Sequence, residues 1–160
     1  MKQNRKAAFL KAGMILWAIC VTAVLYLREP IPVTDSYRET VSRNCSLIPL
    51  KTVRRCLWML QSGNRAWILR GLAELAGNLI LFLPAGGFLP AVFPYLRKVL
   101  PYFLTMLLLI FTAETFQLLT LRGIFDVDDI ALNLLGSLIG FLLFHHNKKK
   151  REPEKLTHAE

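Results

Sequence analysis

The sequence has few of the residues on which most catalytic and metal centres depend. Its 160 residues include only three cysteines and three histidines, and their spacing does not match a zinc site. His145 and His146 are adjacent in a lysine-rich stretch, and His158 lies near the end of the chain. No Ser/His/Asp or Cys/His arrangement is therefore credible. The sequence predicts no catalytic residues of these kinds, no metal and no cofactor.

Acidic residues are also scarce, with 11 Asp and Glu against 20 Lys and Arg, for a net charge of +9. In a soluble protein this imbalance would suggest a nucleic-acid partner. Here the Lys and Arg residues cluster at the ends of apolar runs, which is typical of membrane topology signals. No RNA-binding motif is present. We therefore predict no nucleic-acid binding.

What the sequence does have is apolar residues in long blocks. Hydrophobic residues make up 54% of the chain, and its mean hydropathy is +0.40. A helix needs ~20 residues to cross a bilayer, and helices satisfy their own backbone hydrogen bonds in lipid. The sequence therefore predicts an all-α membrane protein, a single domain over residues 1–144 with four transmembrane helices. We expect these helices at about 12–27, 68–90, 99–121 and 130–144, the last being short for a span.

The two ends of the chain are basic. Residues 1–11 form a basic head, and residues 12–27 form the first apolar run. Together they resemble a secretory signal peptide, but no small-x-small cleavage site precedes Arg28. We therefore expect an uncleaved first span. Residues 145–160 form a basic tail that we expect to be cytoplasmic and unstructured after Glu152.

Charge also predicts the orientation of the four spans. The basic head, Arg97-Lys98 and the tail 145–160 fall on one side of a four-helix arrangement, which the positive-inside rule assigns to the cytoplasm. The loop 28–67 is basic too, but its length approaches the ~60 residues beyond which loop charge counts less. We therefore expect this long loop and the acidic hairpin 122–129 outside the cytoplasm.

One segment of the long loop is amphipathic. Lys51–Gln61 places Val53, Cys56, Leu57 and Leu60 on one helical face. The sequence leaves two interpretations open. The segment is either a helix lying in the membrane interface or a loop helix packed on the bundle.

The three cysteines are interpreted separately. Cys20 lies inside the first apolar run, where we expect a small core residue. Cys45 and Cys56 share the long loop. They either form a disulfide outside the membrane or remain free thiols.

Polar residues interrupt the apolar runs at similar depths in three helices. Glu74 and Asn78 are one turn apart, Glu114 and Gln117 are three residues apart, and Asn133 lies one turn below the hairpin. Polar groups at this depth are costly, so they need a reason. The predicted site comprises eight residues: Glu74, Asn78, Glu114, Gln117, Arg122, Asp126, Asp129 and Asn133. It is either a ligand-binding pocket or a static polar clasp.

Partners for the buried acids can also be predicted. The expected topology places Arg70 and Arg122 near them, and we predict that Arg122 pairs with Glu114 or with the Asp126/Asp129 group. Four acids could hold a divalent cation through oxygen ligands: Glu114, Asp126, Asp128 and Asp129. Arginine pairing and capping of the fourth helix explain the same residues, so no metal is predicted.

Glycine and proline mark two further features. Gly136 and Gly140 extend the stripe of Asp129 and Asn133 and would allow close approach of another helix, including one from a homodimer partner. In the second span, Pro84 and the adjacent Gly86-Gly87 are expected to disrupt regular helix.

These residues carry a resemblance to a known family. Asn78-Leu-Ile-Leu-Phe82-Leu-Pro84-Ala-Gly86 resembles the N-x-x-x-F-x-P-x-G signature of the VanZ-like family. Glu114-Thr-Phe-Gln117 is similar to its E-x-x-Q, and Asp126-Val-Asp-Asp129-Ile-Ala-Leu-Asn133-Leu-Leu-Gly136 to its D-x-x-D-x-x-x-N-x-x-G. Ser46-Leu-Ile-Pro49-Leu50 departs at both ends from the family's N-L-x-P-F element.

The resemblance implies a small multi-pass protein of the bacterial plasma membrane. The family's namesake is associated with reduced susceptibility to teicoplanin-type glycopeptide antibiotics. We therefore expect a protein that modulates the cell envelope or glycopeptide susceptibility by binding rather than catalysis. Its expected partners are the lipid bilayer and either a lipid-linked cell-wall precursor or a glycopeptide. The alternative is an intramembrane enzyme or small carrier acting on a lipid-linked envelope substrate.

Overall fold

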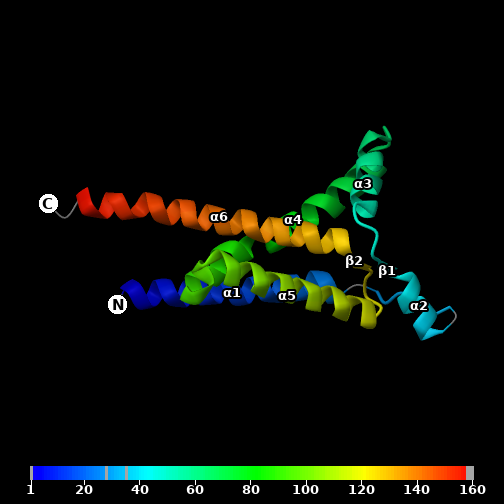
Figure 1. Ribbon diagram of the computed structural model, residues 1–160, viewed down its shortest axis with the longest axis horizontal. Coiled ribbons are helices and arrows are strands. Elements are labelled where there is room, and N and C mark those ends of the chain that lie inside the picture. Colours follow the sequence, from blue (N-terminus) through cyan, green and yellow to red (C-terminus); the bar gives the residue numbers. More distant parts are fainter. Residues whose placement is uncertain (1, 28, 35, 158–160) are drawn as a thin grey trace.

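The computed structural model describes residues 2–27, 29–34 and 36–157. Arg28, at the predicted end of the first span, and the last three residues of the predicted tail lie outside the described residues. The described chain is helical apart from one short strand pairing (Figure 1). Its elements are α1 (Lys2–Tyr26), α2 (Tyr37–Arg43), β1 (Cys45–Ser46), α3 (Lys51–Gln61), α4 (Arg65–Val92), η1 (Pro94–Arg97), α5 (Val99–Leu119), β2 (Phe125–Asp126) and α6 (Val127–Thr157).

Four helices are long and apolar enough to cross a membrane, which confirms the predicted fold class. These spans are Ala7–Tyr26, Arg65–Val92, Val99–Leu119 and Val127–His146. Many of their large apolar side chains are exposed, as on α5 at Leu100, Leu104 and Leu108. Such surfaces fit a lipid surrounding rather than water. Cys20 is exposed on α1, so the prediction of a core cysteine is wrong, because its helix face points outward.

The contact between α4 and α6 is the most extensive in the fold. Gly136 and Gly140 on α6 lie against the carbonyl oxygens of Leu79 and Leu83 on α4, where any Cβ would overlap the backbone. The two helices therefore approach closely through glycine. Because these glycines face a helix of the same chain, the predicted dimer contact through them is wrong.

Helix α4 continues through Pro84 and Pro90, contrary to the predicted disruption. A proline removes one helical N–H and is tolerated in membrane helices when neighbours support the backbone. One such neighbour is Trp17 of α1, whose indole N–H donates to the carbonyl oxygen of Leu81 at 2.8 Å.

The last helix is longer than predicted at both ends. It begins at Val127 and continues to Thr157, so its apolar part is long enough to span, and the described backbone from residue 153 to 157 is helical rather than unstructured. Residues after 147 are mainly Lys, Arg and Glu, which have good helix propensity.

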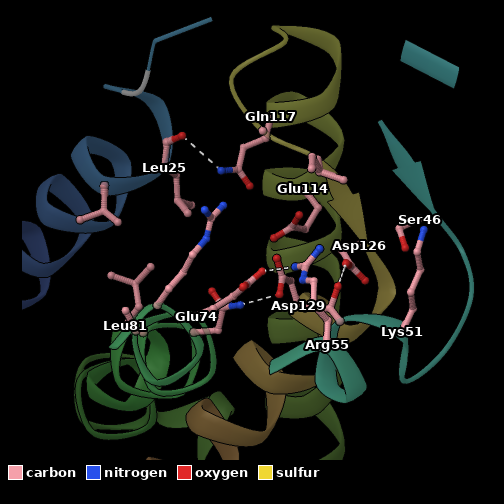
Figure 2. Close-up of a pocket in the computed structure, with 18 of the residues that line it drawn as sticks. Leu25, Ser46, Lys51, Arg55, Glu74, Leu81, Glu114, Gln117, Asp126 and Asp129 are labelled. Carbon is pink, nitrogen blue, oxygen red and sulfur yellow. Dashed lines mark hydrogen bonds and ion pairs between the residues drawn. The ribbon is translucent and has the colours of Figure 1, made fainter. Parts of the chain in front are cut away.

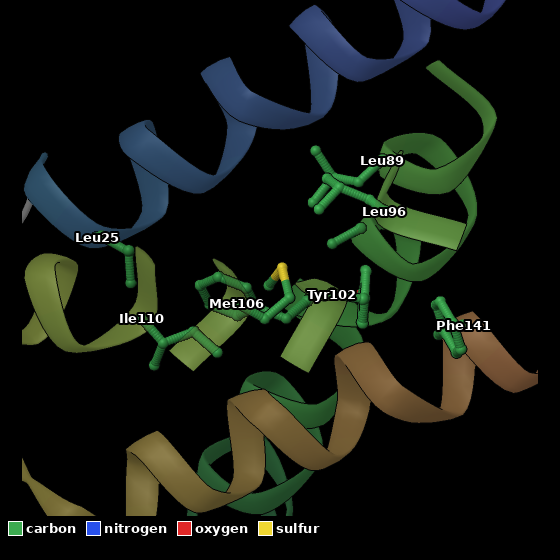
Figure 3. Packing of buried hydrophobic residues seen from close by; sticks show 9 residues of the cluster. Leu25, Leu89, Leu96, Tyr102, Met106, Ile110 and Phe141 are labelled. Carbon is green, nitrogen blue, oxygen red and sulfur yellow. The ribbon is translucent and has the colours of Figure 1, made fainter. Parts of the chain in front are cut away.

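An apolar core packs between α1, α4, α5 and α6 (Figure 3). Tyr102, Met106 and Ile110 of α5 are fully buried there. The Tyr102 ring stacks on Phe141 with centroids 4.5 Å apart, and its hydroxyl donates to the carbonyl oxygen of Ser137 at 3.1 Å. This core joins α5 to α6.

The segments α2, β1, α3 and β2 gather at the end of the molecule opposite both termini (Figure 1). β1 pairs in parallel with β2, with Cys45 opposite Phe125 and Ser46 opposite Asp126. Helix α2 begins at a capping box formed by Ser36 and Glu39. The long loop is therefore folded onto the hairpin before α6, a pairing that the sequence did not predict.

Candidate functional site

Asp128 holds the amphipathic helix α3 in place from the start of α6. Its carboxylate is buried and accepts the backbone N–H groups of Leu50 at 2.6 Å, Thr52 at 2.8 Å and Val53 at 3.1 Å. These are among the first N–H groups of α3, which have no intrahelical acceptor. Leu50 adopts a left-handed φ of 63°, unusual for a β-carbon-bearing residue. Asp128 therefore caps α3 rather than its own helix.

Asp126 caps α6 and is tied to α3 as well. It accepts the N–H of Asp128 at 2.9 Å and the hydroxyl of Thr52 at 2.5 Å. We call Asp126, Asp128 and the α3 groups bonded to them the aspartate clasp. The aspartate clasp fastens a loop helix to the bundle, a contact that the sequence did not predict.

A second link joins α3 to α4. Arg55 forms an ion pair with Glu74, and the Cys56 thiol donates to the other Glu74 oxygen at 3.5 Å. Burial, and then the negative charge of Glu74, raise the pKa of Cys56 from its ordinary value of 9.0 to about 11. The prediction that only Arg70 and Arg122 lie near the acids was therefore wrong, because it did not place α3 against α4.

The amphipathic segment thus packs on the bundle through a face that overlaps the predicted one at Cys56 and, half-buried, at Val53 and Leu60. Thr52, Cys56 and Met59 are buried, whereas Leu57 and Trp58 are exposed. The buried set follows helical spacing. The three cysteines are free thiols.

Two predicted site residues support the end of α1. Gln117 donates to the carbonyl oxygen of Leu25 at 3.2 Å, and Arg122 donates to that of Tyr26 at 2.7 Å. The last carbonyl groups of a helix have no intrahelical donor, and a cation complements their dipole. The predicted pairing of Arg122 with the acids stays a prediction.

A cavity of about 740 Å³ lies beside the aspartate clasp, between α3, α4, α5 and the end of α1. Six of the eight predicted site residues line it: Glu74, Asn78, Glu114, Gln117, Asp126 and Asp129. Figure 2 shows the four acids of this set converging from α4, α5, β2 and α6. Glu114 is 4% exposed and Asp126 5%. The polar residues therefore surround a space and do not only close on one another.

The two remaining predicted residues lie outside the lining. Arg122 lies at the C-terminal end of α1. Asn133 is 1% exposed within the bundle. The Asn133 side-chain oxygen has no hydrogen-bond partner among the described residues. One turn above, Asp129 accepts the side-chain amide N–H of Asn78 at 2.6 Å. The predicted polar stripe of α6 is thus divided between the cavity and the helix contact.

Charge is distributed unevenly around the cavity. Glu114 and Asp126 are buried, whereas four basic side chains of the lining are exposed: Arg43, Lys51, Arg55 and Arg70. We call these four residues the basic rim. The cavity therefore has an acidic interior and a basic opening.

One wall of the cavity is apolar. Val24 and Leu25 of α1 and Ile80 and Leu81 of α4 contribute to the lining. Ile80 is 65% exposed and Val24 48%, so this wall continues onto the outer apolar surface of the spans. The cavity can hold a polar group while an attached apolar chain lies along this wall.

Within the described residues, no group of three or more His, Cys, Asp and Glu side chains has the arrangement of a metal site. Asp126, Asp128 and Asp129 accept hydrogen bonds from hydroxyl, amide and backbone donors, and Glu74 is paired with Arg55. Their arrangement is suited to binding a charged or strongly hydrogen-bonding group.

Sequence reasoning missed Thr52 and Arg55 and the role of Asp128. The available signal was the amphipathic pattern of 51–61, in which the arginines lie off the apolar face. That pattern does not identify which helix the segment packs on, and the parallel pairing of β1 with β2 has no local sequence signature.

Neither a curated protein nor a solved structure is detectably similar to this chain. The family described as VanZ/LLP1 matches residues 14–147, a range that contains the four spans from Met14 onward, α3 and all the cavity-lining residues. The chain therefore belongs to the VanZ/LLP1 family and is a multi-span membrane protein.

Proposed function

We propose that this protein binds the polar head group of a bacterial envelope lipid in the cavity beside the aspartate clasp. The observation that carries the proposal is the lining itself, which combines buried acids and amides with an apolar wall open to the lipid-facing surface. Ligand sites are concave, with a few convergent polar groups in apolar surroundings. A lipid-linked cell-wall precursor fits this description.

The proposal puts the cavity on the outer side of the membrane. Both termini lie at the opposite end of the molecule (Figure 1). The turn that contains Arg97 and Lys98 lies toward the same end, because the His145 ring nitrogen Nε2 is 3.0 Å from the Arg97 carbonyl oxygen. The positive-inside rule assigns that basic end to the cytoplasm. In the long loop, Arg55 is neutralised by Glu74, which weakens its influence on orientation.

Binding is favoured over transport and catalysis by the surroundings of the cavity. Toward the termini, the described part of the bundle contains the apolar core of Tyr102, Met106 and Ile110, which offers no polar path for a carried solute. Asp126 and Asp128 are engaged as caps. Modulation of glycopeptide susceptibility would follow from sequestering or masking the bound head group.

Filling the cavity tests the proposal. A Cβ at Gly77, which lines the cavity, has nothing within 4 Å, so Gly77→Leu should occupy the space without disturbing packing. Gly87 of the same helix is equally open but lies outside the lining, so Gly87→Leu is the matched control. Lipids retained by the purified protein would be measured by native mass spectrometry.

We expect Gly77→Leu to lose the retained lipid while its thermal unfolding matches that of Gly87→Leu. Cells carrying each variant would be tested in parallel for teicoplanin susceptibility, with Glu114→Ala and Asp129→Ala as further cavity variants. Equal lipid retention by wild type, Gly77→Leu and Gly87→Leu would refute binding in this cavity.

A further inference from the structure

Two carboxylates of the cavity accept hydrogen bonds from neutral donors only. Asp129 accepts the amide of Asn78 at 2.6 Å, and Asp126 accepts the Thr52 hydroxyl at 2.5 Å and the Asp128 N–H at 2.9 Å. Neither forms an ion pair with a Lys or Arg side chain of the described residues. Asp126 is buried and Asp129 half-buried, and the cation that acts on Asp129, Arg55, is already paired with Glu74. A carboxylate withdrawn from water without an ion-pair partner of its own is costly. A cationic group of a ligand would find its counter-charge here.

The basic rim contains two cations that are similarly placed for a ligand. Lys51 begins α3 and Arg70 lies one turn before Glu74 on α4, and both are exposed lining residues. Neither makes an ion pair with an acid of the described chain. Arginine and lysine in such positions bind phosphate. An anionic group of a ligand would be stabilised at this opening.

The separation of acidic residues inside the cavity from basic residues at its opening restricts the charges that a ligand can carry. A purely anionic group that entered the cavity would meet Asp126 and Asp129, and a purely cationic group would meet the basic rim at the opening. Like-charge contacts in surroundings of low dielectric constant are strongly unfavourable. A group that carries both charges, a few bonds apart, would satisfy both regions.

Resting on the proposed function, we infer that the cavity recognises a zwitterionic head group in which a phosphate carries a primary ammonium group. The ammonium group contacts Asp129 at the inner wall, and the phosphate contacts the basic rim at Arg70. The apolar wall at Val24 and Ile80 accommodates the attached chain. The volume of about 740 Å³ falls in the range of ~300–1,000 Å³ typical of small-molecule sites.

The test compares lipids that differ in one charge. Purified full-length protein in nanodiscs would be offered phosphatidylethanolamine, its N-acetyl derivative and phosphatidylglycerol in equal amounts, and bound lipid would be read by native mass spectrometry. Soluble glycerophosphoethanolamine would be added as a competitor to distinguish a lipid head group from the free compound. Asp129→Asn preserves an acceptor for Asn78 but removes the charge, and Glu39→Gln is the control because a capping box accepts Gln.

We expect wild type and Glu39→Gln to prefer phosphatidylethanolamine over its N-acetyl derivative by at least about tenfold, the scale of a charged hydrogen bond. Asp129→Asn should bring this ratio close to one. Arg70→Gln should weaken binding of both lipids, whereas the control Arg38→Gln, on α2, should not. Competition by the soluble compound at concentrations comparable to the lipid would support the same chemistry with a free ligand.

Equal binding of phosphatidylethanolamine and its N-acetyl derivative would overturn the inference. An unchanged ratio in Asp129→Asn would do the same. If such lipids were still lost from Gly77→Leu, the proposed function would stand without the ammonium preference. If no lipid depended on Gly77, both would fail.

Discussion

Two parts of this membrane bundle differ in how their helices are held together. From the middle of the bundle toward the termini, α4 and α6 meet through Gly136 and Gly140, and α5 covers them with the apolar ring stack of Tyr102 and Phe141. At the far end the helices stand apart around a cavity, and hydrogen bonds from an added helix, α3, connect them. The comparison predicts that the closely packed part contributes most of the stability, whereas the part with the cavity is the one that we propose for ligand binding.

The largest effect should come from breaking the close contact between helices. In Gly140→Ala, the new Cβ would overlap the carbonyl group of Leu83, a backbone atom that cannot move aside. Overpacking of this kind costs ~1–3 kcal/mol, and more where backbone must shift. We expect a clear drop in the thermal unfolding temperature of the solubilised protein. Gly87→Ala, where the Cβ has open space, should unfold like wild type, and a similar drop in both would contradict this account.

The next effect should come from opening the aspartate clasp. Asp128→Ala leaves the N–H groups of Leu50, Thr52 and Val53 without their acceptor, at ~1–3 kcal/mol for each buried group that water does not reach. We expect faster hydrogen exchange over residues 50–61 with little change in α4 and α6. Asp128→Asn, which keeps one acceptor oxygen, should be intermediate. Uniform exchange changes over the whole bundle would show that the two ends are not separable.

Thiol reactivity should distinguish the clasped helix from the loop beside it. Cys56 is fully buried and its pKa is raised to about 11, so little thiolate is present at pH 8. In proteins that retain a single cysteine, Cys56 should react with a maleimide much more slowly than the partly exposed Cys45.

The pH dependence has a defined sign. Because folding raises the pKa of Cys56, its contribution to stability is complete below pH 9.0 and is lost as the pH rises toward about 11. Labelling of Cys56 should therefore increase over that interval and should also increase at pH 8 in Asp128→Ala. Equal labelling of Cys45 and Cys56 at pH 8 in wild type would contradict the packing of α3.

The smallest effect should come from the Arg55–Glu74 pair. Its side chains are 47% and 27% exposed, and pairs of this kind contribute ~0–1 kcal/mol. Arg55→Gln should change the unfolding temperature by little more than the neighbouring control Arg54→Gln. A large drop in unfolding temperature specific to Arg55→Gln would show that this pair stabilises the fold, which would contradict the account.

The sequence predicted those features that depend on local pattern. The four spans follow from the apolar runs, and helical spacing indicated which polar residues share a face, as for Glu74 with Asn78. Six of the eight predicted residues line one cavity because they lie at one depth on antiparallel helices. Whether they bind a ligand is a prediction that awaits the experiments above.

The missed features depend on contacts between distant segments. Asp128 was interpreted as a cap of its own helix, but it accepts N–H groups from α3, more than 70 residues earlier. The ion pair of Arg55 with Glu74 was not predicted for the same reason. Pro84 was expected to interrupt α4, and the helix instead continues beside α1 and its Trp17. Tertiary packing decided each of these cases.

The most direct test of the central claim is to locate a bound lipid in the chain. A lipid with a photoreactive head group would be crosslinked to the protein in membranes, and the adducts would be mapped by mass spectrometry. We predict that adducts concentrate on the cavity-lining parts of α3, α4 and the hairpin before α6, and that they disappear in Gly77→Leu but not in Gly87→Leu. Adducts spread evenly over the lipid-facing helices, and unchanged in Gly77→Leu, would contradict the account.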